Sequence, residues 1–176
     1  IPKEEKLNNM ILLDIHRPEN FKYKERMTNI IDYANECFNK FNLPVKMLKF
    51  YGTCKYLDEY NLELGNIELI DLLSYKKYIN TIYHCKFIIS DSGTGQEEPA
   101  LLNTPVIVPR DFTERPQSIT NNCSIMLNAN NLSNKIETFN WLEEIFSKKK
   151  IINYDWLGNG ITSDIVISKL KEFLSC

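Results

Sequence analysis

The sequence predicts a single α/β domain built on a doubly wound parallel sheet. Short apolar segments alternate along the 176 residues with longer amphipathic segments, which is the order of strands and helices in such a fold. Phe87–Ile89 and Val106–Val108 are apolar on both faces, as strands are when helices cover both sides of a parallel sheet. The sequence contains no repeat, low-complexity stretch or linker, so one domain accounts for the whole chain.

Three strands and three helices are expected in the first half of the chain. The segment 23–41 has apolar residues at steps of three and four, which predicts a helix, and residues 75–85 repeat this spacing. A shorter helix is expected over 56–64, before the turn at Gly65. Short apolar runs mark the three strands, at 10–15, 45–50 and 67–70.

The second half of the chain continues this alternation. Strands are expected at 86–90, 105–108 and 123–127, and helices at 95–102, 132–149 and 162–174. Gly158 and Gly160 interrupt the pattern before the last helix. The apolar spacing of that helix predicts four buried residues, Ile165, Ile167, Leu170 and Leu174.

Composition limits the class of protein. Hydrophobic residues make up 43% and charged residues 25% of the chain, so a buried core is expected and a disordered chain is excluded. The net charge of −2 does not suit a nucleic-acid-binding surface, and no apolar run is long enough to span a membrane. We therefore expect neither a nucleic acid nor a membrane as a partner.

The cysteines favour a reducing compartment. Their number is odd, and no two have the Cys-x-x-Cys spacing of zinc ligands: Cys37, Cys54, Cys85, Cys123 and Cys176. This pattern predicts neither a disulfide framework nor a metal site, and it favours a cytoplasmic protein. The chain starts at Ile1 without an initiator Met or a signal-peptide pattern, so we expect a piece of a longer protein.

Polar clusters follow three of the expected strands. His16–Asn20 comes after the first strand, Asp91–Glu98 after the fourth and Arg110–Pro116 after the fifth. Ligands of doubly wound sheets bind beyond the carboxyl ends of the strands. The three clusters therefore mark the expected site.

The second cluster lies between a strand and a helix. Its small residues would let the backbone approach a ligand, and free N–H groups with a helix dipole favour an anion such as phosphate. The alternative is a plain turn in which Asp91 or Ser92 caps the helix. Glu97 is expected to be a solvated carboxylate that complements the dipole. Glu98 either does the same or accepts hydrogen bonds from the hydroxyls of a ligand.

Arginines and a histidine complete the candidates. Arg110 and Arg115 follow the fifth strand, where a guanidinium can hold a diphosphate or pair with a carboxylate such as Glu114. His16, at the end of the first strand, suits a proton-transfer or charge-stabilising group, although a lone histidine is more often structural. His84 is expected to be structural or exposed.

Together the clusters resemble the motifs of one family, the non-hydrolysing UDP-N-acetylglucosamine 2-epimerases and their nucleotide-sugar relatives. The family motif His-Arg-x-Glu-Asn occurs at 16–20, Asp-Ser-Gly-Gly-x-Gln-Glu-Glu at 91–98, Arg-Asp-x-Thr-Glu-Arg-Pro at 110–116 and Gly-x-Gly-x-x-Ser at 158–163. The resemblance implies a Rossmann-like fold that forms one half of a GT-B-like two-domain enzyme. Residues 1–176 would be its C-terminal UDP-binding domain.

The resemblance also implies a reaction. UDP is eliminated anti across C1–C2 of the sugar as the C2 proton leaves, and UDP adds back to the glycal after the proton returns on the other face. No cofactor is implied. The implied partners are a UDP-sugar, the N-terminal domain of the same chain, which carries most of the acidic catalytic residues, and a second copy in a homodimer.

The family's site residues carry over by position. The implied substrate contacts are His16 (catalytic), Ser92, Gly93 and Thr94 (diphosphate), Glu98 (ribose hydroxyls) and Arg115 (near the phosphates). Tyr78 falls where the family has an aromatic ring against uracil, and packing in the core is an equal interpretation. Six further residues are expected to support the site, namely Arg17, Glu19, Asn20, Gln96, Arg110 and Glu114.

Two departures from the family pattern bear on the substrate. Thr94 replaces the second Gly of its motif, which resembles the branch that acts on UDP-2-acetamido-2,6-dideoxy-L-hexoses more than the UDP-GlcNAc branch. The segment Phe50–Cys54 lacks the His of an allosteric element found in bacterial UDP-GlcNAc epimerases.

Two alternative functions remain, namely half of a GT-B glycosyltransferase or a non-catalytic UDP-sugar-binding module. The His-Arg-x-Glu-Asn motif favours the epimerase.

Overall fold

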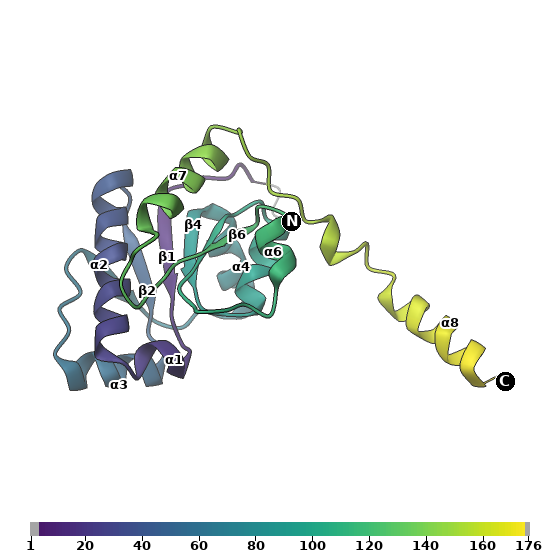
Figure 1. The fold of residues 1–176 in the computed structure, drawn as a ribbon, viewed down its shortest axis with the longest axis horizontal. Helices are drawn as coiled ribbons and strands as arrows, with labels where there is room; N and C mark the ends of the chain where they lie inside the picture. The colour runs from purple at the N-terminus through teal and green to yellow at the C-terminus, as the bar shows by residue number, and fades with distance from the viewer. Residues whose placement is uncertain (1–3, 175–176) are drawn as a thin grey trace.

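The computed structural model describes residues 4–174, which form a six-stranded parallel sheet flanked by helices (Figure 1). The strand order is β3-β2-β1-β4-β5-β6, which confirms the doubly wound, Rossmann-like fold. All six expected strands form: β1 (Met10–Asp14), β2 (Val45–Leu48), β3 (Ile67–Ile70), β4 (Cys85–Ser90), β5 (Val106–Val108) and β6 (Ser124–Met126). Ile1 and Cys176 lie outside the described residues.

The strand order reverses at the neighbouring strands β1 and β4. The chain leaves β1 toward β2 on one side and leaves β4 toward β5 on the other side. The loops that follow these two strands therefore diverge, and the space between them is where doubly wound folds bind ligands.

Helices connect the strands and cover both faces of the sheet. They are α1 (Pro18–Phe21), α2 (Lys24–Phe41), α3 (Tyr51–Tyr60), α4 (Tyr75–His84), α5 (Glu98–Leu101), α6 (Pro116–Thr120), α7 (Lys135–Phe146) and α8 (Thr162–Leu174), with 3₁₀ turns η1 (Thr94–Gln96) and η2 (Asp155–Leu157). The short helices α1 and α6 were not expected, and each begins with a proline, whose missing N–H has no partner to lose there. Within residues 4–174, no helix has the length and apolar character needed to cross a membrane.

Asparagines in the left-handed conformation set several helix ends. Asn42 ends α2 at φ 51°, and Asn61 ends α3 at φ 49°. The expected helix at 56–64 is therefore placed too late, because α3 begins directly after β2 and stops at Asn61. Early in α3, Gly52 packs under the ring of Phe21, where a Cβ would lie 2.9 Å from the ring carbon Cζ.

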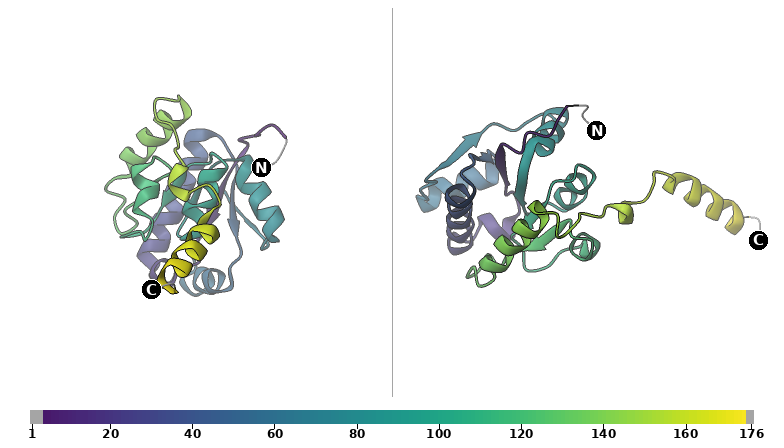
Figure 2. Two further views of the ribbon diagram at one scale, coloured as in Figure 1. Left: turned by 90° about the vertical axis from the view of Figure 1, so that its right-hand side faces the viewer. Right: turned by 90° about the horizontal axis from the view of Figure 1, so that it is seen from above.

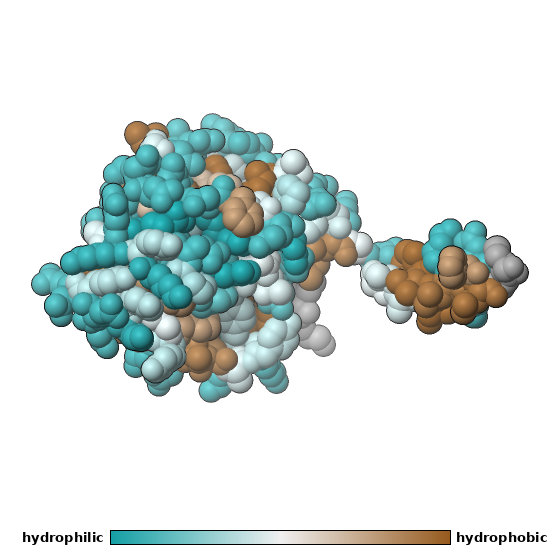
Figure 3. Space-filling model, turned by 60° about the horizontal axis from the view of Figure 1, so that its bottom comes forward, coloured by the Kyte–Doolittle hydropathy of each residue, from teal (hydrophilic) through white to brown (hydrophobic). Residues whose placement is uncertain are grey.

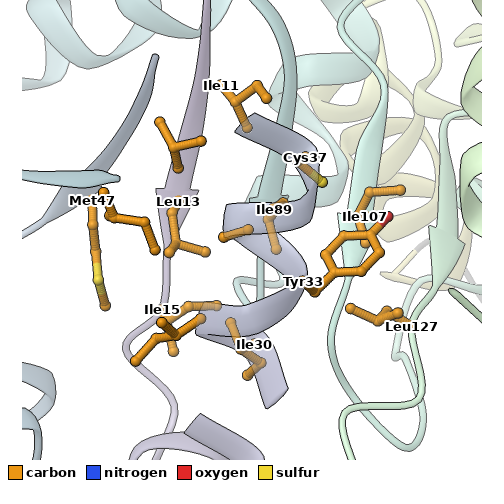
Figure 4. Packing of buried hydrophobic residues seen from close by; sticks show 14 of the residues in the cluster. Ile11, Leu13, Ile15, Ile30, Tyr33, Cys37, Met47, Ile89, Ile107 and Leu127 are labelled. Carbon is orange, nitrogen blue, oxygen red and sulfur yellow. The ribbon is translucent and has the colours of Figure 1, made fainter. Parts of the chain in front are cut away.

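Two hydrophobic clusters cover the two faces of the sheet. Along β1 the side chains alternate, so Ile11 and Leu13 pack with α2 in one cluster and Leu12 packs with residues of α4 in the other. Figure 4 shows the first cluster, with Tyr33 of α2 lying over the sheet. The buried Tyr33 hydroxyl hydrogen-bonds with Thr138 Oγ1 of α7 at 2.7 Å, which joins the two helices on this face.

Helix α8 does not pack on the sheet. It extends away from the domain in Figure 1 and in the right-hand view of Figure 2. The four residues expected to be buried are exposed, Ile165, Ile167 and Leu170 by about half and Leu174 by 79%. The expectation was wrong because the apolar spacing predicts a one-sided helix but does not say what covers that side. Figure 3 shows hydrophobic side chains gathered on this projecting helix.

Two leucine-to-alanine substitutions distinguish the packed helix α7 from α8. Leu142 in α7 is fully buried, so Leu142→Ala should lower the free energy of unfolding by about 2–5 kcal/mol. Leu170 in α8 is half exposed, so Leu170→Ala should change it by less than about 0.5 kcal/mol. Urea denaturation followed by circular dichroism measures both values. Equal losses in the two variants would contradict the packing described above.

Candidate functional site

A buried carboxylate joins the loops that follow β1 and β4. Asp91 is fully buried directly after β4. Its Oδ1 accepts a hydrogen bond from the backbone N–H of His16 at 3.0 Å. Its Oδ2 accepts from the backbone N–H of Arg17 and from Asn20 Nδ2, both at 3.0 Å. Burial raises the pKa of Asp91, while these donors favour its ionised form. One side chain therefore holds the first two polar clusters together.

Asn20 extends this connection to the loop after β5. The side chain is fully buried, and Nδ2 also donates to the carbonyl oxygen of Pro109 at 2.9 Å. Its Oδ1 accepts a hydrogen bond from Arg26 Nε at 3.0 Å, and Arg26 pairs with Asp111 at 2.9 Å. The structure thus brings the three polar clusters together at the carboxyl end of the sheet.

Close backbone contacts shape the loop after β4. The backbone N–H of Ser92 donates to Ser90 Oγ at 3.1 Å, and the hydroxyls of Ser92 and Thr94 lie 3.1 Å apart. A Cβ at Gly95 would lie only 2.6 Å from Ser90 Oγ and 2.9 Å from Ser92 Cβ. Glycine at this position is therefore required by space, and it lets the loop fold back on the end of β4.

The helix expected over 95–102 is interrupted. The 3₁₀ turn η1 precedes the four-residue helix α5, because Pro99 has no N–H to continue a helical ladder. So short a helix has only a weak dipole. The groups able to hold an anion are instead the loop N–H groups, its hydroxyls and Arg17, whose Nη2 lies 3.6 Å from the position of a Cβ on Gly93.

Gln96 fixes this loop to α6 and to the loop after β5. The side chain is fully buried. Its Oε1 accepts hydrogen bonds from Thr113 Oγ1 at 2.6 Å and from Ser118 Oγ at 3.1 Å. Its Nε2 donates to the carbonyl oxygen of Ser92 at 3.3 Å. The position of Ser92 therefore depends on a side chain that a ligand would not touch.

Both candidate arginines pair with carboxylates. Arg110 is 4% exposed and donates to Glu114 at 2.7 Å, and it lies 3.2 Å from Glu19. The hydrogen bond from Arg110 lowers the pKa of Glu114 to about 2. Arg115 pairs with Glu97. The ion-pair interpretation thus holds for both arginines, and the expectation of a merely solvated Glu97 was wrong because Arg115 lies within reach of its carboxylate.

A pocket of about 420 Å³ opens beside the loop after β4. Side chains from the ends of β1 and β2, from the loops and from α4 line it: Asp14, His16, Leu48, Phe50, Leu72, Leu73, Tyr75, Tyr78, Ser92 and Thr94. The lining combines apolar walls with a few polar groups, as small-ligand sites do. The Tyr75 hydroxyl donates to Glu98 Oε1 at 2.9 Å, so Glu98 lies next to this pocket.

His16 and Tyr78 meet at the same carboxylate in this pocket. His16 Nδ1 lies 2.9 Å from Asp14 Oδ1, and the Tyr78 hydroxyl donates to Asp14 Oδ2 at 2.7 Å. The hydrogen bond to Asp14 raises the pKa of His16, although partial burial opposes it. The ring of Tyr78 packs against the core cluster that contains Leu12. Tyr78 therefore has a packing role and also faces the pocket.

Two features of the sequence lie away from the pocket. Gly158 and Gly160 have φ of 79° and 83° before α8, and among the described residues nothing approaches within 4 Å of where their Cβ atoms would be. The fourth motif is thus not brought to the other three. His84 is buried, and its Nδ1 accepts a hydrogen bond from the backbone N–H of Leu7 at 3.2 Å, so the structural interpretation was right.

Sequence reasoning missed Asp14, which contacts both His16 and Tyr78. A signal was present in the strand period. Asp14 shares the face of Leu12, two residues earlier, whereas Ile11 and Leu13 occupy the other face. A carboxylate on an otherwise buried strand face requires a partner, which is a reason to look for one in α4.

The fold and this edge define an α/β domain with a pocket of mixed polar and apolar lining at the reversal of its sheet. The chain belongs to the UDP-N-acetylglucosamine 2-epimerase family, whose model matches residues 1–171.

Named relatives agree with this assignment. A UDP-N-acetylglucosamine 2-epimerase from Methanocaldococcus jannaschii is 29% identical over 164 residues, which cover 89% of this chain and 43% of the relative. One from Methanococcus maripaludis is 30% identical over 96% of this chain and 46% of the relative. The crystal structure of the M. jannaschii enzyme in complex with UDP-GlcNAc and UDP matches with a TM-score of 0.79 at 27% identity, over 95% of this chain and 46% of that one. The chain therefore spans less than half the length of these relatives.

Adding one methyl group should distinguish two glycines of the loop. Gly95→Ala places a Cβ against Ser90 and Ser92, so it should lower the free energy of unfolding by about 1–3 kcal/mol. Gly93→Ala meets its nearest atom at 3.6 Å and should be tolerated. Thermal melts measure the difference, which is roughly 2–12 °C for a domain of this size. A Gly93→Ala variant that melts as low as Gly95→Ala would show that the loop is packed differently.

Proposed function

We propose that this chain is the UDP-binding half of a UDP-N-acetylhexosamine 2-epimerase. The observation that carries the proposal is the convergence of His16, Ser92 and Thr94 on one pocket at the reversal of the sheet, with Glu98 bonded to Tyr75 beside it. Family membership and a relative crystallised with UDP-GlcNAc and UDP support this ligand class. The substrate is UDP-GlcNAc and its 2-epimer UDP-ManNAc, or a UDP-2-acetamido-2,6-dideoxy-L-hexose, the latter suggested by Thr94.

The diphosphate is proposed to lie against Ser92, Gly93 and Thr94. Two hydroxyls, the N–H groups of a tight loop and the nearby Arg17 guanidinium supply donors of the kind that bind phosphate oxygens. Arg115 lies at the end of the next loop and pairs with Glu97. A bound diphosphate would compete with Glu97 for this guanidinium, so Arg115 is a second source of positive charge.

Glu98 and Tyr78 are proposed to contact the nucleoside. The Glu98 carboxylate lies beside the pocket with one hydrogen bond from Tyr75, and a carboxylate accepts further hydrogen bonds from ribose hydroxyls. Tyr78 lines the pocket, and its ring would lie against the uracil. Its hydroxyl is held by Asp14, which fixes the ring for such a contact.

The proposed reaction breaks and reforms two bonds of the sugar. A base removes the C2 proton, the C1–O bond breaks with its electron pair leaving on UDP, and a glycal remains. Return of a proton to the other face of C2 and re-addition of UDP at C1 give the epimer. A protonated His16 beside the diphosphate loop would stabilise the charge on departing UDP. The base is expected on the N-terminal domain of the parent protein.

The exposed apolar face of α8 indicates that another domain contacts this helix. Six large apolar residues are half or more exposed on this helix: Ile165, Val166, Ile167, Leu170, Phe173 and Leu174. An exposed apolar face of this kind is unfavourable in water and marks a contact surface. We propose that the N-terminal domain of the same parent chain covers it. A homodimer of the parent remains a prediction from the family resemblance.

The function is tested by turnover of the parent protein in deuterium oxide. Incubation with each of several UDP-hexosamines, followed by proton NMR, should show the 2-epimer of one of them with deuterium at C2. The 176-residue chain alone should give no epimer, because it lacks the proposed base. Absence of epimer with every UDP-hexosamine, while released sugar is transferred to an acceptor, would instead favour the glycosyltransferase alternative.

Neighbouring glutamates provide a matched test of the nucleoside contact. Glu98→Ala should weaken UDP binding about tenfold to a hundredfold, because a charge-assisted hydrogen bond contributes about 1.5–3 kcal/mol. Glu97→Ala should weaken it little, because removal of Glu97 frees Arg115 for the diphosphate. Isothermal titration calorimetry measures both affinities. Equal weakening by the two substitutions would rule out the role of Glu98.

A further inference from the structure

We propose that Asp14 is a positioning residue for His16, which holds the imidazole in one orientation with its proton on Nδ1 and its Nε2 toward the ligand. The catalytic consequence rests on the proposed function, whereas the geometry of the pair does not. Asp14 ends β1, and its side chain is 3% exposed. Leu12, on the same strand face, is apolar and fully buried. Packing alone would therefore favour an apolar side chain at position 14, so the carboxylate needs another explanation.

The Asp14 carboxylate is itself held in place. Tyr78 donates to Oδ2 at 2.7 Å. Ser90, which pairs with Asp14 on the neighbouring strand β4, places its Oγ 3.4 Å from the same oxygen. The other carboxylate oxygen, Oδ1, remains available to His16 and lies 2.9 Å from its Nδ1. Two donors on one oxygen fix the plane of the carboxylate, and the carboxylate in turn fixes the ring.

The chemistry of the pair selects one form of the imidazole. A carboxylate only accepts hydrogen bonds, so the Nδ1 that faces it must carry the proton. In the neutral ring the lone pair is then on Nε2. The ring of Phe50, whose centroid lies 4.8 Å from that of His16, packs against the imidazole and restricts its rotation. Nε2 is thus the nitrogen left to receive or deliver a proton, or to contact a departing diphosphate.

The second nearby carboxylate has a different task. His16 Nδ1 also lies 3.6 Å from Asp91 Oδ1, but the oxygens of Asp91 accept hydrogen bonds from two backbone N–H groups and from Asn20. Asp91 therefore positions the backbone of His16, and Asp14 positions its ring. The charged and titratable groups that face the imidazole or its partner are Asp14, Asp91, Arg17 and Tyr78.

The two histidines of the chain provide an internal control. His84 Nδ1 accepts a hydrogen bond from a backbone N–H, so a neutral His84 must carry its proton on Nε2. We therefore expect opposite tautomers for His16 and His84. Two-dimensional ¹H–¹⁵N spectra of the imidazoles in the 176-residue chain report the tautomer of each directly, and a His84→Gln variant assigns the signals. Observation of His16 with its proton on Nε2 would overturn the proposal without any substitution at Asp14.

Substitution of Asp14 tests the consequence for the reaction. In the parent protein, Asp14→Asn should lower kcat more than tenfold with KM changed less than about threefold, and it should shift the basic limb of the pH profile to lower pH, because protonated His16 is then lost at a lower pH. The ¹H–¹⁵N spectra of Asp14→Asn should show a lower His16 pKa, because a hydrogen-bonding negative charge has been removed. Tyr78→Phe keeps the carboxylate and should not lower this pKa.

These outcomes separate the inference from the proposed function. A wild-type parent that turns over no UDP-hexosamine contradicts the function, yet the tautomer of His16 still tests the pairing with Asp14. Conversely, an active parent whose Asp14→Asn variant keeps its kcat and pH profile contradicts the positioning role alone. If Asp14→Asn does not fold, the tautomer in the wild-type chain decides.

Discussion

The site depends on the buried carboxylate of Asp91, at the point where the sheet reverses its strand order. Its three hydrogen bonds join the loop after β4 to the loop after β1, and each such bond to a charged group contributes about 1.5–3 kcal/mol. Separating the loops would leave a buried charge without donors, which is strongly unfavourable. The backbone of His16 and the loop that begins at Ser92 are therefore held in one arrangement whether or not a ligand is bound.

Some charged side chains in this region hold the loops together, and others are available to a bound ligand. Arg110 is buried between Glu19 and Glu114 and serves to hold the loop after β5. Arg115 is less buried and pairs with a single carboxylate, so a diphosphate could recruit it by displacing Glu97. The negative charge of Asp14 favours a protonated His16 beside the loop. The proposed epimerase chemistry needs this combination of a fixed imidazole and mobile positive charge.

Local patterns predicted most of the fold and the clusters of the site. The apolar runs of the strands, the apolar spacing of α2 and the small residues of the loop at 91–98 are local features. They are determined by residues close together in the chain, so they can be recognised from the sequence alone. The end of α3 was misplaced because Asn61 adopts a left-handed conformation that no periodicity indicates. The exposure of Leu170 depends on what covers α8, and the pairing of Glu97 with Arg115 depends on tertiary distance. The role of Asp14 was missed because its partners come from α4 and from the loop after β1.

The pocket between the loops after β1 and β4 is proposed to hold the UDP group. Titration of the ¹⁵N-labelled chain with UDP, followed by backbone amide NMR, tests it directly. We expect saturable shifts that are largest at Ser92, Gly93 and Thr94, smaller ones at His16 and Arg17, and none in α8. Shifts that do not saturate, or that are largest outside the three polar clusters, would contradict it.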